Sequence, residues 1–402
     1  MGKKVMILGA SALQVPAIKK AKELGYEVIL VDYDEQAAGF GLADVKLVVS
    51  TLDQEEVYRQ ALKYQPDFVF TSTSDGPVRT AAYVNEKLGK RPDLAYEDSL
   101  CATIKSHMRR RLMENNVPIP AFYAVEDFDG FRAAVGALEG SCIVKPADNA
   151  GSRGVVLLDR SRTKTEEEMR RIYEYSRGNS RNGTVMVEEY MTGPEVSVEA
   201  MTVDGQTTIL AVTDKYITPP PYFVELAHCE PSCLDSGVQE RIRQTALQAA
   251  AAIRLQNGPS HTEIKVTKDG PKIVELAARL GGDFITARLV PLSTGIDMVG
   301  ASVLLATGEK PDLLRRWQKG AAIHFIQGEE GVIRSIETDE ALSNLPGVEE
   351  IVIYKKPGDV LCGTKSSNDR LGHIITVGET AKEAMEAGER AVRMVKVRME
   401  DV

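Results

Sequence analysis

The stretch TVMVEEYMTGPE, residues 184–195, is the part of the sequence that decides how the rest is interpreted. Apolar residues alternate from Val185, which predicts a strand that ends at Glu188. The Thr-Gly-Pro sequence at 192–194 predicts a turn, after which Glu195 opens a second strand. Carboxylates at the exit of a strand are usually only solvated. The alternative is a site in which the linker backbone holds a flat, polar ligand and Glu195 binds its hydroxyl groups.

The composition is that of a globular protein with an acidic net charge. The chain has 402 residues, of which 43% are hydrophobic and 27% are charged, and its net charge is −9. This length predicts about two to four domains and a large core. Because nucleic-acid phosphates require a basic surface, the charge argues against nucleic acid as a partner. A local basic pocket for a phosphorylated small molecule is still compatible with it.

Five cysteines are scattered along the chain, and only Cys229 and Cys233 have the spacing of metal ligands. Since no second pair accompanies them, a zinc site is not expected, and reduced thiols are typical of a cytoplasmic protein. The apolar part of MGKKVMILGAS is too short for a signal peptide, and no apolar run reaches membrane-spanning length. We therefore expect a cytoplasmic protein without a membrane partner.

Residues 3–95 alternate strand and helix patterns, which predicts a parallel sheet with right-handed crossovers. Ligands of such sheets bind at the carboxyl ends of the strands, here at Gly9, at Asp32 and at 72–75. The loop G-A-S-A-L-Q lacks the second and third glycines of a dinucleotide-binding loop. We interpret this edge as a wall of a substrate site and not as a nicotinamide site.

A connector follows, in which Lys105 opens a basic helical stretch, SHMRRRLMENN, that ends before Pro118. The arginines at 109–111 have two interpretations, a solvated helix face or a surface that pairs with carboxylates.

The next strand ends at Lys145 and is followed by the loop ADNAGSRGV, residues 147–155. A loop of small residues between two strands can donate backbone N–H groups to phosphates. Ser152 adds a hydroxyl group, and Gly154 permits a close backbone approach. The alternative is a mobile hairpin, and Lys145 just before the loop favours the phosphate site.

The segment TDKYITPPPYFVELAHCEPS, residues 213–232, is rich in proline and is interpreted as a long ordered loop, which is typical of functional segments. It contains Glu225 and His228, which one helical turn would place on the same side.

Two strands joined by the turn at 268–270 carry Glu263 and Glu275. Adjacent strands bring such carboxylates onto one face, where they can bind a hard cation. The alternative is an exposed charged pair beside Lys265 and Lys272. The apolar residues around Glu275 favour the metal site, because a carboxylate without a partner is costly there.

In this order, the motifs resemble the ATP-grasp superfamily over nearly the whole chain. The resemblance implies an α/β ATP-grasp fold with an N-terminal Rossmann-like pre-grasp domain and a C-terminal α+β cap. The expected parts are the pre-grasp domain at 1–96, a connecting helix at 97–120, an ATP-grasp domain of two lobes at 121–304 with its hinge near 184–195, and the cap at 305–402.

The resemblance also implies an ATP site. Lys105 and Lys145 would contact the phosphates, Lys145 with a catalytic role, and Ser152 and Gly154 would belong to the loop that covers them.

The adenine would lie against Glu188 and the linker at Glu189 and Met191. Glu195 would bind the ribose hydroxyls.

By the same resemblance, Glu263 and Glu275 would hold Mg²⁺, with Mn²⁺ as a substitute, and Arg279 would stabilise the transferred phosphoryl group and bind substrate. The family pattern often places Asn two residues after the second metal-binding Glu, where this chain has Ala277.

Within the superfamily, PPPYFVELAHCEPS and ELAARLGGD are most similar to the L-amino-acid ligases. There, residues at the positions of Glu225 and His228 line the amino-acid pocket. The resemblance to glycinamide ribonucleotide synthetase is weaker, since its N-terminal Gly-Arg-Glu-His is absent. No match to the bicarbonate-site arginines of biotin carboxylase is found.

The resemblance implies an ATP-dependent carboxylate–amine ligase that forms an amide or peptide bond through an acyl phosphate, acts on amino acids, and releases ADP and phosphate. Its partners would be a small-molecule carboxylate and a small-molecule amine, and a homodimer is also considered. Two alternatives are a purine-pathway ligase and a nucleotide-binding module without catalysis, which only Ala277 supports.

Overall fold

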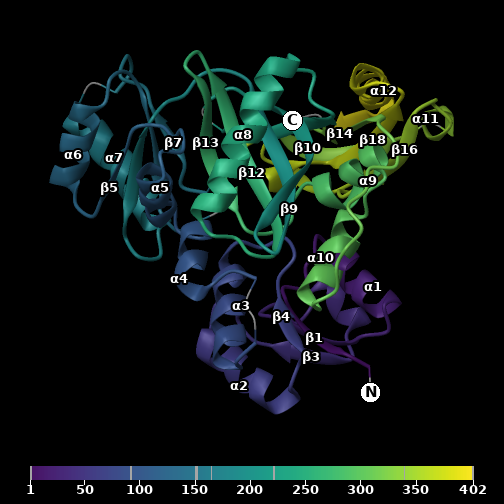
Figure 1. The fold of residues 1–402 in the computed structure, drawn as a ribbon. Coiled ribbons are helices and arrows are strands. Elements are labelled where there is room, and N and C mark those ends of the chain that lie inside the picture. The colour runs from purple at the N-terminus through teal and green to yellow at the C-terminus, as the bar shows by residue number, and fades with distance from the viewer. Residues whose placement is uncertain are drawn as a thin grey trace.

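The computed structural model describes residues 2–90, 93–149, 153–163, 165–220, 222–338 and 340–400. Figure 1 shows an α/β protein in which the N-terminal part lies below a central sheet and a smaller lobe lies to one side. The predicted α/β class and the parallel N-terminal sheet are confirmed by the sheets described below.

The N-terminal part is the predicted parallel sheet, with strand order β3-β2-β1-β4. Its strands are nearly continuous apolar runs, because helices cover both faces. The bounds are β1 (Lys4–Leu8), β2 (Glu27–Asp32), β3 (Val45–Val48), β4 (Phe68–Phe70), α1 (Val15–Glu23), α2 (Gln54–Tyr64) and α3 (Gly76–Lys87), with the 3₁₀ turn η1 (Ala38–Leu42).

Asp32, at the end of β2, accepts hydrogen bonds from the protein backbone with both carboxylate oxygens. Its two oxygens accept the backbone N–H groups of Ala10 at 2.7 Å and of Asp34 at 3.0 Å.

The connector forms α4 (Tyr96–Ser99), η2 (Leu100–Ala102) and α5 (Lys105–Glu114). The small lobe is a four-stranded antiparallel sheet in the order β5-β8-β6-β7, packed on two helices. Its elements are β5 (Phe122–Val125), α6 (Phe128–Ala137), β6 (Cys142–Pro146), β7 (Val156–Leu158), α7 (Glu166–Gly178) and β8 (Val185–Glu189).

The central sheet has eight strands in the order β13-β12-β9-β10-β11-β14-β18-β16 (Figure 1). Five of them come from the middle of the chain: β9 (Glu195–Val203), β10 (Gln206–Ile217), β11 (Glu225–Glu230), β12 (Gly258–Thr267) and β13 (Gly270–Ala277). Helix α8 (Ser236–Ala252) contributes to the core beneath them. The π-helix η3 (Ile285–Leu289), α9 (Val290–Thr294) and α10 (Met298–Ala306) lead toward the C-terminal strands.

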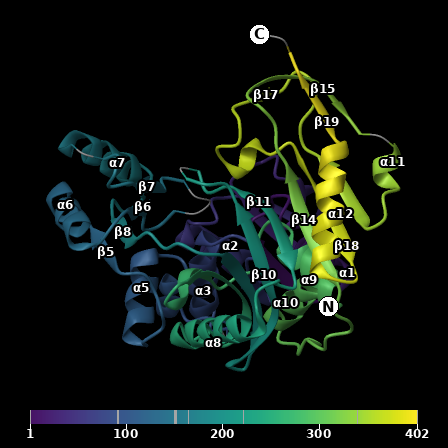
Figure 2. The ribbon, with the colours of Figure 1, turned by 90° about the horizontal axis from the view of Figure 1, so that it is seen from above.

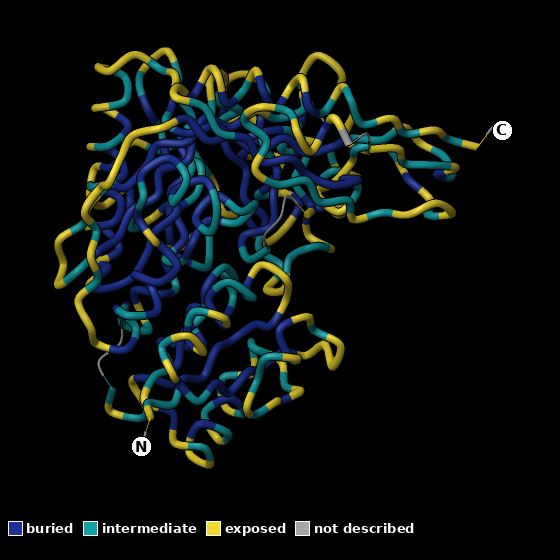
Figure 3. Tube along the Cα trace, turned by 90° about the vertical axis from the view of Figure 1, so that its right-hand side faces the viewer, coloured by how far each residue is buried: buried dark blue, intermediate teal, exposed yellow. Residues whose placement is uncertain are grey.

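The C-terminal strands do not form a separate sheet, because they extend the central one. They are β14 (Gly320–Ile326), β16 (Val348–Ile353) and β18 (Gly372–Gly378), covered by α12 (Ala381–Met394). A small sheet of β15 (Gly331–Glu337), β17 (Val360–Leu361) and β19 (Lys396–Met399) projects beyond them, with α11 (Glu340–Ser343) and η4 (Ser367–Asp369) nearby (Figure 2). Figure 3 shows buried chain concentrated in the central sheet, whereas this projection is largely exposed or half-buried.

The expectation of a long irregular loop at 213–232 is wrong. β10 continues to Ile217 and pairs with β11 from Glu225, so ladder hydrogen bonds satisfy most of this backbone. The register moves from Tyr216↔Ala227 to Ile217↔Glu225, which leaves one extra residue in β11. Such a bulge shifts the alternation of side chains by one. Glu225 and His228 therefore share a face through a bulged strand and not through a helical turn.

No single helix among the described residues is long and apolar enough to cross a membrane. One pair, Ile285–Thr294 with Met298–Ala306, meets the requirement by length and composition, but it is bent by 116°.

Candidate active site

The small lobe and the central sheet face each other across a cavity of about 160 Å³. Its apolar walls come from both sides and include Ile143 and Val155 of the small lobe and Val274 of the central sheet. Nine of the predicted residues line it: Lys105, Lys145, Glu188, Glu189, Met191, Glu195, Glu225, Glu263 and Glu275.

Glu188 lies at the centre of a buried ion cluster. Arg109 donates to its carboxylate from Nε at 2.8 Å and from Nη2 at 3.0 Å, and Lys145 Nζ lies 2.7 Å from Oε2. Although burial raises the pKa of Glu188, Arg109 and Lys145 hold it at about 2. The Glu188 side chain is therefore occupied by two cations, so contact with an adenine at this position would come from the neighbouring backbone.

Lys145 has a lowered pKa. Burial is the main cause, and burial together with repulsion from Arg109 and Lys105 outweighs the attraction of Glu188. A lysine in such surroundings gains from an additional anion, and a phosphate group supplies one.

Lys105 begins helix α5 and reaches toward the central sheet. Its Nζ lies 2.7 Å from Glu275 Oε1 and 2.8 Å from the carbonyl oxygen of Asn149. Burial lowers the pKa of Lys105, but Glu275 more than compensates, so the pKa is raised overall. Lys105, Lys145 and Arg109 together carry one more charge than the carboxylates that they bind.

On the opposite wall, Lys215 of β10 joins two candidate carboxylates. Its Nζ lies 2.6 Å from Glu263 Oε1 and 3.0 Å from Glu195 Oε1, and Lys265 lies 2.7 Å from Glu195 Oε2. Burial opposes ionisation of both acids, yet Lys215 holds the pKa of Glu195 below its usual value and that of Glu263 well below it. The Glu195 carboxylate can still accept ribose hydroxyls while it pairs with lysine.

Glu263 and Glu275 are direct partners in the register of β12 and β13. Among the described residues, no group of three or more His, Cys, Asp or Glu side chains could hold a metal ion. Mg²⁺ commonly binds through one or two carboxylates and completes its shell with substrate phosphates and water, so this pair fits it. Ala277 is buried at the end of β13 and adds no oxygen ligand from its side chain.

Behind the cavity, Glu199 and His261 form a buried pair with Nδ1 2.7 Å from Oε1. Burial lowers the pKa of His261, but Glu199 raises it to about 9. The other ring nitrogen lies 3.6 Å from Glu263 Oε1, so this pair packs directly behind a candidate metal ligand.

Glu225 and His228 converge on residues from two later segments. Arg370 Nη2 lies 3.0 Å from Glu225 Oε2, and the same guanidinium group binds both oxygens of Asp283. His228 Nε2 lies 3.2 Å from Asp283 Oδ2 and is fully buried, whereas Glu225 lines the cavity. Burial opposes the ionisation of Asp283, but His228 and Arg370 keep its pKa below the usual value.

Arg279 crosses from the central sheet to the N-terminal part. Its Nε donates to Asp75 Oδ1 at 2.8 Å, and Nη1 donates to the carbonyl oxygen of Leu280. Although burial lowers the pKa of Arg279, Asp75 raises it overall.

Comparison with known families identifies two parts of the chain. The model of the ATP-grasp domain matches residues 138–287, and that of the L-amino acid ligase C-terminal domain 2 matches residues 323–400. Residues 138–287 are therefore an ATP-grasp domain.

Curated relatives agree with this assignment. Alanine–anticapsin ligase of Bacillus subtilis is 29% identical over 57% of the chain and 52% of its own length. An L-arginine-specific L-amino acid ligase of Bacillus subtilis is 24% identical over 78% of the chain and 76% of its own length. The chain thus spans about half the length of the first of these relatives.

A solved L-amino acid ligase from Bacillus licheniformis has the same fold as this chain. It is 21% identical, covers 100% of the chain and 99% of its own length, and gives a TM-score of 0.84.

Two predicted site residues, Ser152 and Gly154, belong to the predicted phosphate loop, and Gly154 is not part of the cavity lining given above. Ser152 is outside the described residues. Gly154 has φ +77°, and a Cβ there would lie 2.7 Å from atoms of Pro146 and Asn179. Glycine is therefore required at this position by backbone conformation and close packing.

Four charged residues of this ATP-grasp site were not singled out from the sequence: Arg109, Lys215, Asp283 and Arg370. Arg109 gave a signal, because pairing with carboxylates was one interpretation of its arginine run, and Asp283 is the last residue of the motif ELAARLGGD. Lys215 and Arg370 belong to no recognisable motif. Each binds a carboxylate that is distant in the sequence, Glu263 for Lys215 and Glu225 for Arg370.

Proposed function

We propose that the protein is an ATP-dependent carboxylate–amine ligase that joins two amino acids, or an amino acid and another amine, and releases ADP and phosphate. The observation that carries the proposal is the buried cationic group of Lys105, Lys145 and Arg109, which exceeds its carboxylates by one charge beside an apolar slot. Such a group suits a triphosphate next to a base.

The reaction needs two displacements. A substrate carboxylate oxygen attacks the γ-phosphorus, and the bond to ADP breaks, which yields an acyl phosphate. The amine nitrogen then attacks the acyl carbon, phosphate leaves, and the nitrogen loses a proton. Positioning and neutralisation of charge supply most of the acceleration in such chemistry.

Each residue has a proposed part in this scheme. Lys105 and Lys145 hold the phosphates, and Arg279 stabilises the transferred phosphoryl group. Glu263 and Glu275 hold Mg²⁺, which neutralises phosphate charge. Neighbouring backbone at 188–191 contacts the base, and Glu195 binds the ribose.

The amino-acid end is proposed at Glu225, with His228 acting through Asp283. The relatives that are named as amino acid ligases support an amino-acid substrate. We also propose the divisions 1–96, 97–120, 121–304 and 305–402, a hinge near 184–195, a cytoplasmic location, and assembly as a homodimer.

The test measures phosphate release from ATP and Mg²⁺ with pairs of amino acids, and identifies products by mass spectrometry. We expect release only when an acid and an amine are both present, together with a product lighter by one water than their sum. ATP binding without turnover on any pair would instead indicate a nucleotide-binding module. Turnover that requires a ribosylamine would indicate a purine-pathway ligase.

A further inference from the structure

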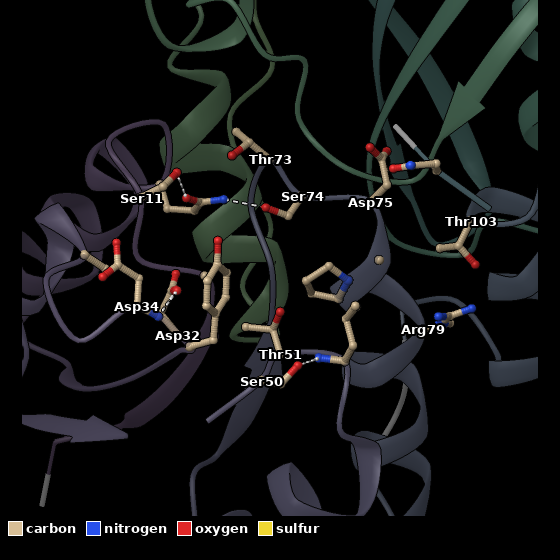
Figure 4. A pocket seen from close by; sticks show the side chains of 18 of the residues that line it. Ser11, Asp32, Asp34, Ser50, Thr51, Thr73, Ser74, Asp75, Arg79 and Thr103 are labelled. Atoms are coloured by element: carbon tan, nitrogen blue, oxygen red, sulfur yellow. Dashed lines mark hydrogen bonds between the residues drawn. The ribbon is translucent and has the colours of Figure 1, made fainter. Parts of the chain in front are cut away.

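A cavity of about 610 Å³ lies at the carboxyl ends of the strands of the N-terminal sheet (Figure 4). Gly9, Asp32 and Thr73, which end or follow β1, β2 and β4, all line it. Its volume is within the range of pockets that enclose a small-molecule ligand. The lining is rich in hydroxyl and charged groups, so it suits a polar ligand.

This cavity opens toward the proposed reaction centre. It shares Lys105, Asn149, Arg153 and Glu275 with the nucleotide cavity. A substrate whose reacting group lies near the Lys105–Glu275 pair therefore has room to extend along the N-terminal sheet.

The carboxylates that line the cavity are already engaged within the protein. Asp32 accepts two backbone N–H groups, and Asp34 accepts that of Gln36. Asp148 accepts from Ser180 Oγ and from the backbone N–H groups of residues 181 and 182. As described above, Asp75 binds Arg279 and Glu275 binds Lys105.

Unlike these carboxylates, two guanidinium groups of the lining, those of Arg79 and Arg181, have no carboxylate partner in the part of the chain that the structure describes. Among the described residues, neither Arg79 nor Arg181 has a carboxylate within ion-pair distance or a side-chain hydrogen bond. Arg181 Nη1 lies 3.9 Å from the position that a Cβ of Gly76 would occupy. Gly76 and Arg79 are three residues apart on helix α3, so they are neighbours on its surface.

Arg181 thus approaches the turn of α3 that carries Arg79, and both residues line the cavity. Figure 4 shows Arg79 beside Thr103, on the side away from Asp32 and Asp34. Thr73 Oγ1 is buried in the wall and has no hydrogen-bond partner among the described residues. An oxyanion bound by both arginines would supply the negative charge that neither has as a partner within the protein, and it would match the donor geometry of guanidinium groups.

We infer that one of the two substrates carries a second anionic group, a carboxylate or a phosphate, remote from its reacting group, and that Arg79 and Arg181 bind this group. The inference rests on the proposed ligase function, because it assigns the cavity to a substrate of that reaction. It excludes a small neutral amino acid as the preferred occupant.

The test is isothermal titration of the full chain saturated with Mg²⁺ and a non-hydrolysable ATP analogue, so that the triphosphate site is filled. The probes are O-phospho-L-serine, L-glutamate and, as the neutral reference, L-serine. We expect at least one anionic probe to bind at least tenfold more tightly than L-serine. A phosphate preference and a carboxylate preference are distinguished by which of the two probes binds more tightly.

The double variant Arg79→Gln/Arg181→Gln should lose at least tenfold of this preference and keep its affinity for the ATP analogue. Arg171→Gln, an exposed arginine of α7 in the lobe that carries Arg181, is the matched control and should keep the preference. Equal binding of all three probes, or an unchanged preference in the double variant, overturns the inference. Phosphate release with pairs of neutral amino acids would then still support the ligase, so the two proposals fail separately.

Discussion

Glu263 and Glu275 face each other across β12 and β13, yet each is bound to a different lysine, Lys215 at 2.6 Å and Lys105 at 2.7 Å. The two carboxylates therefore do not form a bare acidic pair. A divalent cation between them would share the carboxylates with these lysines, and the phosphates that it brings would supply new partners for the lysines.

The Glu263–Glu275 pair can be tested as a metal site by substitution of one carboxylate. Glu275→Gln should raise the Mg²⁺ concentration needed for half-maximal turnover and lower turnover by orders of magnitude, because the metal loses a charged ligand. Phosphate release across a Mg²⁺ series measures both effects, with Glu240→Gln on the exposed face of α8 as the control. Full activity at low Mg²⁺, or simple unfolding of the variant, would make Glu275 a structural charge.

Lys145→Ala should weaken ATP binding and turnover together. The substitution removes a buried cation from the proposed phosphate site and leaves Glu188 with Arg109 alone. Calorimetric titration with an ATP analogue and a turnover assay provide the measurements. Lys268→Ala, at an exposed position in the turn between β12 and β13, serves as the control. An unchanged affinity for the ATP analogue together with an unchanged turnover rate would show that Lys145 does not bind the phosphates.

Arg109→Met should lower the free energy of unfolding by about 3 kcal/mol, near the lower end for breaking a buried ion pair, because Lys145 still partners Glu188. Urea denaturation measures the difference. Arg110→Met, at the exposed neighbouring position of α5, should change stability little. A loss that is equal in the two variants would contradict the importance of the buried cluster.

The raised pKa of Glu230 predicts that the free energy of unfolding depends on pH. It is fully buried, it accepts from Thr213 and Ser293, and burial raises its pKa to about 8 from an ordinary value of 4.5. Between these values the unfolded chain has lost the proton and the folded chain retains it. Stability should therefore fall as the pH rises through this window, by up to about 1.4 kcal/mol per pH unit.

Glu230→Gln removes this titration. In urea denaturation at pH 5 and pH 8, the stability of the variant relative to wild type should increase toward pH 8. A difference that is the same at both pH values would show that Glu230 is ionised in the folded protein.

Glu225→Ala and His228→Ala should each raise the Michaelis constant for an amino acid or change which one is used, while ATP affinity stays near wild type. Glu225 lines the cavity, and His228 fixes Asp283, which shares Arg370 with Glu225. His107→Ala, an exposed histidine, is the control. Loss of ATP binding, or an unchanged amino-acid preference, would assign both residues a structural role.

Periodic patterns explain what could be predicted about the fold. The alternation of strands and helices at 3–95 gave the parallel sheet, because each element repeats its own apolar period. The segment 213–232 was misjudged because prolines dominate its local signal, whereas pairing with β10 and β14 determines its structure.

The partners of the site residues were less accessible to prediction. Arg109 lies 79 positions from Glu188, and Arg370 lies 145 positions from Glu225. Such pairs depend on how the sheets are stacked, which no local window contains. Local motifs identified the residues around the nucleotide cavity, and only the fold identified the counter-ions that hold them.

The continuity of the central sheet across β11 and β14 has a consequence for engineering by segment exchange. Ala227 pairs with His324, and Glu230 with Ala321, so the C-terminal strands cover the edge of β11 from Ala227 onward. A chimera that receives this region from a relative must reproduce the pairing register as well as the new pocket residues. A graft displaced by one residue would turn Arg370 away from Asp283 and Glu225, and the hybrid would lose these ion pairs while the cavity lining from the small lobe stayed intact.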